Sequence, residues 1–297
     1  TTEIYTLSLH DALPIYIVSW WDFGYPVRYY ADVLTHSDGG MQNGNLTYLE
    51  SLALTSTSQA MAANLLREGI EIKEIIAKDG LESTGGTFGD IMKYGNSGEE
   101  KVAAEMIKKI SADDYAPANR TRDIYWMMTY RILPIFGTIE QFSNYDLQTK
   151  ELNRNAYFYF THNVSESENE LDLGGGIIVD KGLGILKNAM GFAKIKTIYK
   201  VSESMSGEVS TSRFDLHNDG ILYLINIEGT NSMVVANEEM FRSNFIQMFV
   251  FNNYNPKYFE PIIVNPMMKI YKLKDRTETI SPIESTHSGE RSSKSPS

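Results

Sequence analysis

The pattern of apolar and polar positions changes near residue 145 of this 297-residue chain. Before that point, apolar residues recur mainly at helical spacing, as in "TSQAMAANLLREG" at residues 57–69 and "EIKEIIAKDG" at 71–80. Beyond it, short runs of aromatic and β-branched residues alternate with Gly, Asn and Asp, which is typical of strands joined by turns. We therefore expect a helical region followed by a β-rich one.

The first region contains one predicted strand and several predicted helices. The run "YIVSWW" at residues 16–21 is β-branched and aromatic, and it ends at Asp22, which predicts a buried strand. The most apolar helical pattern, "TRDIYWMMTYRILPIFGTIEQF" at 121–142, is interrupted by Pro134 and Gly137. Amphipathic spacing with capping residues at the ends predicts further helices over residues 57–69, 71–80 and 98–114.

The second region is predicted to be a small barrel or sandwich, because its strands are short and separated by turn residues. The predicted strands cover residues 155–164, 175–180, 193–201, 207–215 and 220–228. A helix over 237–251 and a closing strand over 268–274 follow. We therefore expect an α+β fold with a mainly helical core at 16–145, a β-rich, barrel-like insertion at 146–235 and a return to the core at 236–274.

The two ends of the chain do not fit this organisation. Residues 1–15, "TTEIYTLSLHDALPI", have no clean periodicity and stop abruptly at the first strand. They resemble translated sequencing-adapter read-through, and we expect them to be non-native. The tail at 275–297 is rich in Ser and Pro, which predicts a disordered or foreign segment.

Composition narrows the function without identifying it. Hydrophobic residues make up 42% of the chain and cysteine is absent, so a substantial core is expected, while disulfides, thiol catalysis and thiolate zinc sites are excluded. The formal net charge of −11 argues against nucleic acid and anionic lipid as partners. No apolar run in the sequence approaches the length of a bilayer span.

Sequence motifs for metal or nucleophilic chemistry are absent. The five histidines form no HxH or HExxH pair, so we expect no metal site built by this chain. No GxSxG, GxGxxG or phosphate-binding loop is complete either. We expect Asp32 and Asp38 to be solvated loop acids rather than members of a catalytic pair.

Trp20, Trp21 and Asp22 stand together at the end of the first predicted strand. One interpretation is structural: two core tryptophans on opposite faces of a strand end, with Asp22 capping the next turn. The other is functional, because an indole N–H only donates and a carboxylate only accepts hydrogen bonds. Together these groups satisfy one hydroxyl, so such a pocket would test a ligand for an alcohol.

The sequence "WWDFGYPVRYYADV…DGG" at residues 20–40 closely resembles the WWDYG signature of oligosaccharyltransferase catalytic subunits, in particular the bacterial single-subunit PglB type. The segments "TRDIYWMMTYRILPIF", "NFIQMFVFNNYN" and "KIYKLK" are similar to the same family and occur in the same order. The resemblance extends over residues 16–274.

The resemblance implies that this chain is the soluble C-terminal domain of a polytopic inner-membrane enzyme, on its periplasmic side. That family transfers a lipid-pyrophosphate-linked oligosaccharide to the side-chain amide of Asn in Asn-X-Ser/Thr. In the family, the two Trp and the Asp bind the hydroxyl of the acceptor Ser or Thr. By this resemblance the role passes to Trp20, Trp21 and Asp22.

A second family motif, Met-x-x-Ile-x-x-x-(Val/Ile/Ala), aligns with Ile132, Ile135 and Ile139. Their spacing places all three on one helical face. The resemblance implies that Ile135 contacts the methyl group of an acceptor Thr, with Ile132 and Ile139 in support. This sequence departs from the family at three positions: Phe23 replaces Tyr, Ile132 replaces Met, and Pro134 is expected to kink or restart the helix.

The resemblance also implies which components lie outside this chain. The family uses a divalent cation, Mn or Mg, bound by acids of the membrane part and its loops, and the lipid-linked oligosaccharide binds there too. We therefore expect a peptide with Asn-X-Ser/Thr as the partner of this chain, which alone is expected to be inactive. Two alternatives stay open: a stand-alone periplasmic peptide- or glycan-binding module, and a glycoside hydrolase using Asp22 with a second carboxylate.

Overall fold

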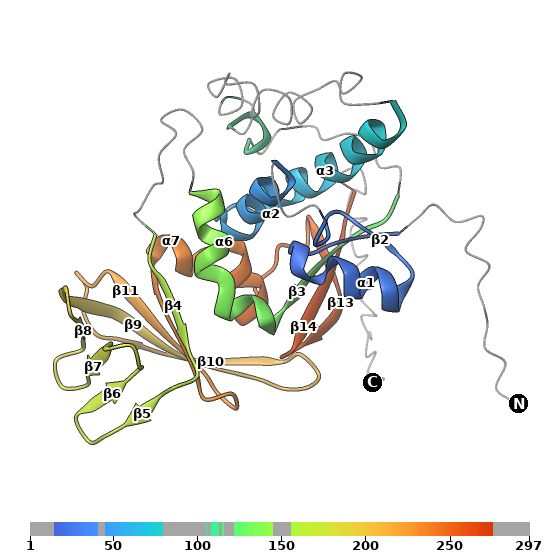
Figure 1. Ribbon diagram of the computed structural model, residues 1–297. Coiled ribbons are helices and arrows are strands. Elements are labelled where there is room, and N and C mark those ends of the chain that lie inside the picture. Colours follow the sequence, from blue (N-terminus) through green and yellow to red (C-terminus); the bar gives the residue numbers. More distant parts are fainter. Residues whose placement is uncertain are drawn as a thin grey trace, which may run out of the picture.

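The computed structural model describes residues 15–40, 45–79, 108–112, 122–144 and 156–275, together with Glu105 and Tyr115. Figure 1 shows two parts side by side: helices packed on a small sheet, and a curled β-rich sheet. The helix predicted over 98–114 lies mostly outside the described residues, as do the two ends of the chain.

A mixed five-stranded sheet underlies the helical part. Its strands are β1 (Tyr16–Val18), β2 (Leu34–Thr35), β3 (Ile124–Thr129), β13 (Phe259–Asn265) and β14 (Met268–Leu273), in the spatial order β13-β14-β3-β1-β2. β1 is parallel to both β2 and β3, whereas β14 is antiparallel to β3 and to β13. Sequence-distant segments therefore meet next to the strand that leads into Trp20.

The helical segments share one core with this sheet. They are η1 (Trp21–Phe23), α1 (Gly24–Ala31), α2 (Asn45–Thr55), α3 (Gln59–Asp79), η3 (Tyr130–Ile135), α6 (Phe136–Ser143), α7 (Glu238–Phe241) and a π-helical turn, η4 (Ile246–Val250). α2 packs against both α3 and α6. Trp126, Phe136 and Phe245 are fully buried, and the rings of the two phenylalanines lie 4.6 Å apart.

Tertiary contacts override the sequence pattern at several places in this part. The first half of the helix predicted at 121–142 is the strand β3, because it pairs with β1 on one side and β14 on the other. The helices predicted at 57–69 and 71–80 form the single helix α3. Residues 60–71 are all buried, and this packing outweighs the preference of Gly69 for a helix end.

Other boundaries differ because local and tertiary preferences disagree. The strand predicted at 16–21 stops at Val18, and the helix predicted at 237–251 is divided into α7 and η4. The sequence pattern did not predict α2 or β13. Pro261 lies within β13, which is tolerated because β13 is an edge strand of its sheet. The closing strand predicted at 268–274 is confirmed as β14.

The predicted α+β fold with a β-rich insertion is confirmed. The strands of the curled sheet are β4 (Phe158–Thr161), β5 (Ser165–Glu166), β6 (Glu170–Asp172), β7 (Ile178–Asp180), β8 (Ile185–Asn188), β9 (Gly191–Glu203), β10 (Val209–Asp215), β11 (Leu222–Ile227) and β12 (Ser232–Asn237). They are ordered β4-β12-β11-β9-β8-β7-β6-β5, with β10 also paired to β9. The long strand β9 pairs with β8 in its first part and with β11 in its second, so the sheet curls along it.

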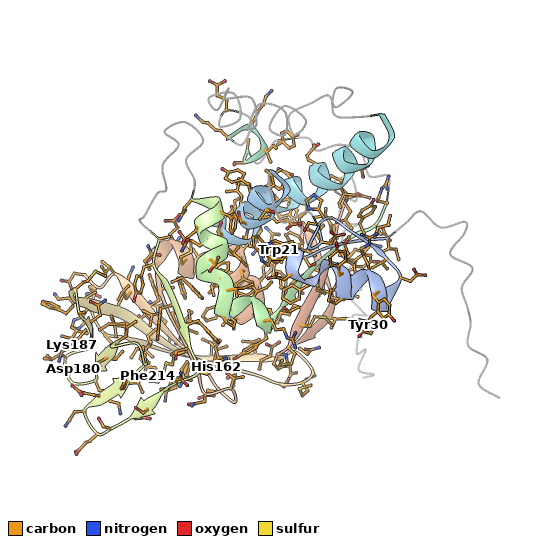
Figure 2. The ribbon with its side chains drawn as sticks, viewed as in Figure 1. Trp21, Tyr30, His162, Asp180, Lys187 and Phe214 are labelled. Atoms are coloured by element: carbon orange, nitrogen blue, oxygen red, sulfur yellow. The ribbon has the colours of Figure 1, made fainter. Side chains whose placement is uncertain are left out.

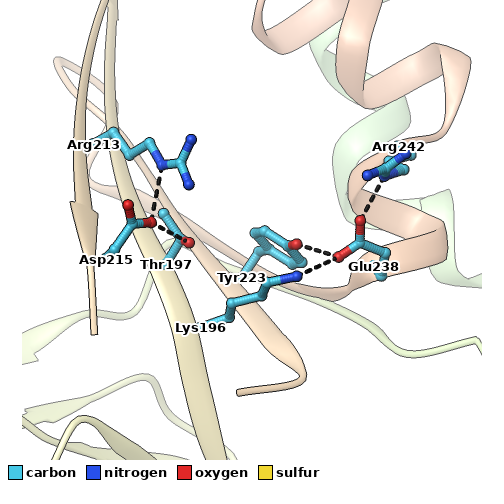
Figure 3. A network of polar contacts seen from close by, with 7 residues as sticks. All are labelled: Lys196, Thr197, Arg213, Asp215, Tyr223, Glu238 and Arg242. Carbon is cyan, nitrogen blue, oxygen red and sulfur yellow. Dashed lines mark hydrogen bonds and ion pairs between the residues drawn. The ribbon is translucent and has the colours of Figure 1, made fainter. Parts of the chain in front are cut away.

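A polar network fixes the start of α7 to the curled sheet (Figure 3). Glu238 accepts hydrogen bonds from the Tyr223 hydroxyl, from Lys196 Nζ at 3.1 Å and from Arg242 Nε at 2.5 Å. The bond from Tyr223 is the main cause that holds the pKa of Glu238 below its ordinary value. Asp215 of β10 accepts a hydrogen bond from the Thr197 hydroxyl of β9 at 2.8 Å, which connects the two strands, and another from Arg213 Nε of its own strand at 2.9 Å.

Candidate functional site

Trp20, Trp21 and Asp22 lie where β1 ends and α1 begins. The turn is the short 3-10 helix η1, closed by a hydrogen bond from the Phe23 N–H to the Trp20 carbonyl at 3.0 Å. A Cβ added at Gly24 would lie 2.1 Å from the Ser37 carbonyl oxygen. Only glycine therefore fits where this turn rests on the loop that follows β2.

The two indoles differ in burial. Trp20 is 3% exposed, and its ring lies 6.2 Å from the Trp21 ring and 5.7 Å from the Phe142 ring. Trp21 is half-buried, and its indole N–H is enclosed without a hydrogen-bond partner among the described residues. The structural interpretation, with both tryptophans in the core, therefore holds for Trp20 and leaves Trp21 with an unsatisfied donor.

Asp22 is exposed at the surface of the turn. Partial burial raises the pKa of its carboxyl above the ordinary value, and a hydrogen bond with the Trp20 side chain opposes that rise. In the part of the chain that the structure describes, no side chain caps η1 or α1, so Asp22 does not perform the capping role of the structural interpretation. The turn thus carries an exposed carboxylate, which is hydrogen-bonded to the Trp20 side chain, and the preceding residue, Trp21, has an enclosed indole donor.

In the loop that follows β2, the expectation for Asp38 is wrong. Asp38 was expected to be a solvated acid, but it is 5% exposed, because Arg28 Nη1 donates to it at 2.6 Å and the Gly40 N–H donates at 2.9 Å. Asp32 is exposed, as expected, at the left-handed end of α1. The ion pair with Arg28 made burial of Asp38 possible, and the sequence did not reveal it.

A buried acid supports this loop and was missed in the sequence. Glu50, on α2, lies 2.7 Å from Nδ1 of His36 and accepts a short hydrogen bond from the Ser37 hydroxyl. All three side chains are almost completely buried. The sequence analysis did not identify Glu50, because it did not predict α2 and therefore could not place Glu50 opposite the loop.

The isoleucine segment changes helix type at Pro134. Residues through Ile135 form the 3-10 helix η3, and the α-helix α6 restarts at Phe136, as expected from Pro134. Ile132 and Ile139 are fully buried in the core, whereas Ile135 is only partly buried. Of these three residues, Ile135 alone retains surface for an additional contact.

Two absences complete the description of the site. Among residues 15–40, 45–79, 122–144 and 156–275, no three His, Asp or Glu side chains are grouped closely enough to hold a metal ion. Over the described helices, none combines the length and the hydropathy that crossing a bilayer requires.

Two family models match the chain: the STT3/PglB/AglB core domain over residues 14–149, and the STT3/PglB C-terminal beta-barrel domain over residues 157–236. Two undecaprenyl-diphosphooligosaccharide–protein glycotransferases from strains of Campylobacter jejuni are each 29% identical over 273 residues. The aligned region covers 87% of this chain but 36% of each relative, so the chain spans about a third of their length.

A solved structure with the same fold is the C-terminal domain of PglB from C. jejuni. Its TM-score is 0.73 at 26% sequence identity, and the similarity covers 88% of this chain and 94% of that one. Both parts of the fold described above are therefore found together in a known domain.

Proposed function

Because this chain belongs to the STT3/PglB family, we propose that it recognises the Ser or Thr hydroxyl of an Asn-X-Ser/Thr acceptor for an oligosaccharyltransferase. The parent enzyme, in this proposal, transfers a lipid-pyrophosphate-linked oligosaccharide to the Asn. The chain spans about a third of its relatives, so we assign the transfer chemistry and the binding of the lipid-linked donor to the remaining part.

The observation that carries the proposal is the unsatisfied indole N–H of Trp21, in the same short turn as the exposed carboxylate of Asp22. Leaving a buried donor unpaired costs about 1–3 kcal/mol, so a ligand that supplies an acceptor there gains affinity. A hydroxyl accepts from an indole and donates to a carboxylate at the same time. Trp20 is buried, its ring lies 6.2 Å from that of Trp21, and its side chain is hydrogen-bonded with Asp22, so it contributes to the position of both groups.

Ile135 supports the same proposal from a second direction. Its partly exposed side chain offers an apolar contact that distinguishes Thr from Ser, since Thr carries one more methyl group. Burying one such carbon contributes about 0.8 kcal/mol, or roughly fourfold in preference. Ile132 and Ile139 hold the segment in the core without reaching the ligand.

The remaining assignments follow from the family rather than from this site. The described residues do not fit a metal ion, so the proposal places the divalent cation, Mn or Mg, on parts of the parent enzyme outside this chain. We likewise propose that this domain faces the periplasm on an inner-membrane protein. Family membership favours this function over a stand-alone binding module or a glycoside hydrolase.

Conservative substitutions in a full-length parent enzyme test the proposal. Trp21→Phe keeps an aromatic side chain and removes the N–H, while Asp22→Asn keeps the shape and removes the charge. Each substitution should weaken transition-state binding of the acceptor peptide by about 1–3 kcal/mol. This loss corresponds to a roughly 5- to 150-fold lower kcat/KM. Asp32→Asn, which changes an exposed acid at the far end of α1, serves as the matched control. Unchanged kcat/KM in both site variants, with melting temperatures unchanged, would contradict the proposal.

A further inference from the structure

The segment that carries Ile135 is stabilised only weakly by its own backbone hydrogen bonds. η3 is a six-residue 3-10 helix that contains Pro134. Helices of this type have poor hydrogen-bond geometry and are rarely longer than three or four residues, and proline contributes no backbone donor. Ile132 and Leu133 anchor the middle of η3 in the core, and the position of Ile135 depends as well on the contacts made at the two ends of η3.

At the first end, Tyr130 is fixed by hydrogen bonds of its backbone and of its hydroxyl, which also lies 3.4 Å from Nδ1 of His162. Its backbone N–H donates to the Met267 carbonyl at 2.9 Å, and its hydroxyl lies 2.7 Å from the hydroxyl of Ser232. Ser232 is 0% exposed and belongs to β12 of the curled sheet. The side chain that begins η3 is thus bound to the β-rich insertion.

The hydrogen bonds around Ser232 form a complete set. Its hydroxyl donates to the Thr230 carbonyl at 3.1 Å, which leaves its oxygen to accept two further bonds. The Tyr130 hydroxyl and Nδ1 of His162, at 2.7 and 2.8 Å, are placed to donate them. Since a hydroxyl offers one donor and two acceptor positions, Ser232 is fully used and fixes the direction of the Tyr130 hydroxyl.

Strand β4 contacts both ends of η3. The side chains of Phe158 and Phe160, two residues apart in β4, lie on one face of the strand, and His162 follows just after its end. The Phe160 ring meets the Tyr130 ring edge-on at 6.2 Å, and the Phe158 ring meets that of Phe136, just after η3, at 5.0 Å. Figure 1 shows β4 running next to α6, so the insertion flanks the whole segment.

On the basis of the function proposed above, we propose that Tyr130 is a positioning residue through which the β-rich insertion sets the location of Ile135. The insertion then determines how strongly the enzyme prefers Thr over Ser, although no part of it contacts the acceptor in this scheme. Tyr130, Ser232 and His162 are specificity-determining residues in this sense.

The structural step is tested on this chain by NMR of isoleucine methyl groups. Tyr130→Phe removes only the hydroxyl, and it should shift the Ile135 methyl resonance while that of Ile17, on β1, stays in place. Tyr159→Phe is the matched control, because its hydroxyl donates to the Leu173 carbonyl at 2.9 Å within the same insertion. An Ile135 resonance that is unmoved in Tyr130→Phe and in Ser232→Ala overturns the proposal.

The functional step uses competing Ser and Thr acceptor peptides and the full-length enzyme. In wild type a preference for Thr of roughly fourfold is expected from one buried methyl group. Tyr130→Phe and Ser232→Ala should lower it at least twofold, with the Tyr159→Phe value unchanged. If Ile135→Ala abolishes the preference while both variants retain it, the positioning role is wrong. If Ile135→Ala has no effect, the proposed contact of Ile135 is wrong, and with it this route to specificity.

Discussion

The two parts of the molecule are held together by different means. In the β-rich insertion, regular strand pairing is accompanied by exposed ion pairs such as Lys181–Glu166 at 2.5 Å and Lys187–Asp180 at 2.7 Å. In the helical part, charged groups such as Glu50 are buried within the core. Figure 2 places Trp21 inside the helical part and Asp180 with Lys187 at the outer end of the insertion.

This difference shows where the chain depends on single contacts. Exposed ion pairs contribute little, because water and salt screen them. A buried charge or hydrogen-bonding group is costly when its partner is removed. The candidate site lies in the helical part, which has buried polar groups and short turns. We therefore expect single substitutions to destabilise the helical part more than the insertion.

The largest effect on stability is expected where the helical part meets the insertion. Lys269 of β14 is 0% exposed, and it forms an ion pair with Glu203 of β9 at 3.2 Å. Burial lowers the pKa of Lys269 and raises that of Glu203. Lys269→Met leaves the buried Glu203 unpaired and should lower the free energy of unfolding by about 3–5 kcal/mol, measured by urea denaturation.

Two controls sharpen that comparison. Lys187→Met breaks an exposed ion pair of the insertion and should leave the urea midpoint nearly unchanged. The double variant Lys269→Met/Glu203→Gln removes both buried charges and should recover much of the lost stability. Equal losses for Lys269→Met and Lys187→Met would contradict the contrast between the two parts.

The next largest effect is expected at Gly24. Gly24→Ala would place a Cβ within 2.1 Å of a backbone oxygen, and the resulting shift of the turn should lower the free energy of unfolding by at least about 1–3 kcal/mol. Gly137→Ala is the matched control, because its Cβ would meet the Phe158 carbonyl at an ordinary 3.6 Å inside α6. Calorimetry should show a lower melting temperature for Gly24→Ala than for Gly137→Ala. Equal stability of the two variants would contradict the proposed steric limit at Gly24.

The last effect concerns pH at Glu140, where solvent screening of the partly buried carboxyl keeps the change in stability small. Burial, together with the negative charge of Glu239, raises the pKa of Glu140 from 4.5 to about 7 in the folded protein. The folded state therefore holds a proton that the unfolded chain releases at lower pH, and stability falls as pH rises from about 4.5 through about 7. Glu140→Gln should flatten this part of the profile, measured by thermal melting across that range. Parallel pH profiles for wild type and Glu140→Gln would rule out this linkage.

The sequence predicted the insertion better than the core, for a physical reason. Strands of the insertion such as β9 and β11 carry their signal locally, in alternating or continuous apolar residues bounded by turns. By contrast, β3 was predicted to be helical, since its strand conformation depends on pairing with β1 and β14.

The sequence predicted which residues form the candidate site, but it did not predict how their side chains are buried or hydrogen-bonded. Trp20, Trp21 and Asp22 could be named from their chemistry, but only the fold separates a packed Trp20 from a Trp21 with an unsatisfied donor. The support of the loop by Glu50, and of η3 by Ser232, joins segments far apart in the chain. No local pattern encodes such contacts, so they could not be predicted.

The order of the strands in the small sheet constrains how the protein is made. Tyr16 pairs with Ile124, and Met128 pairs with Lys269, so the sheet joins the beginning, the middle and the end of the described chain. Such non-local pairing slows folding, because long loops must close before the contacts form. The ribosome releases β14 after the other four strands of this sheet, and until then β3 presents an open edge to which another chain can add. The interval between synthesis of the Trp20 turn and completion of its sheet is therefore the period when this protein most needs protection from aggregation.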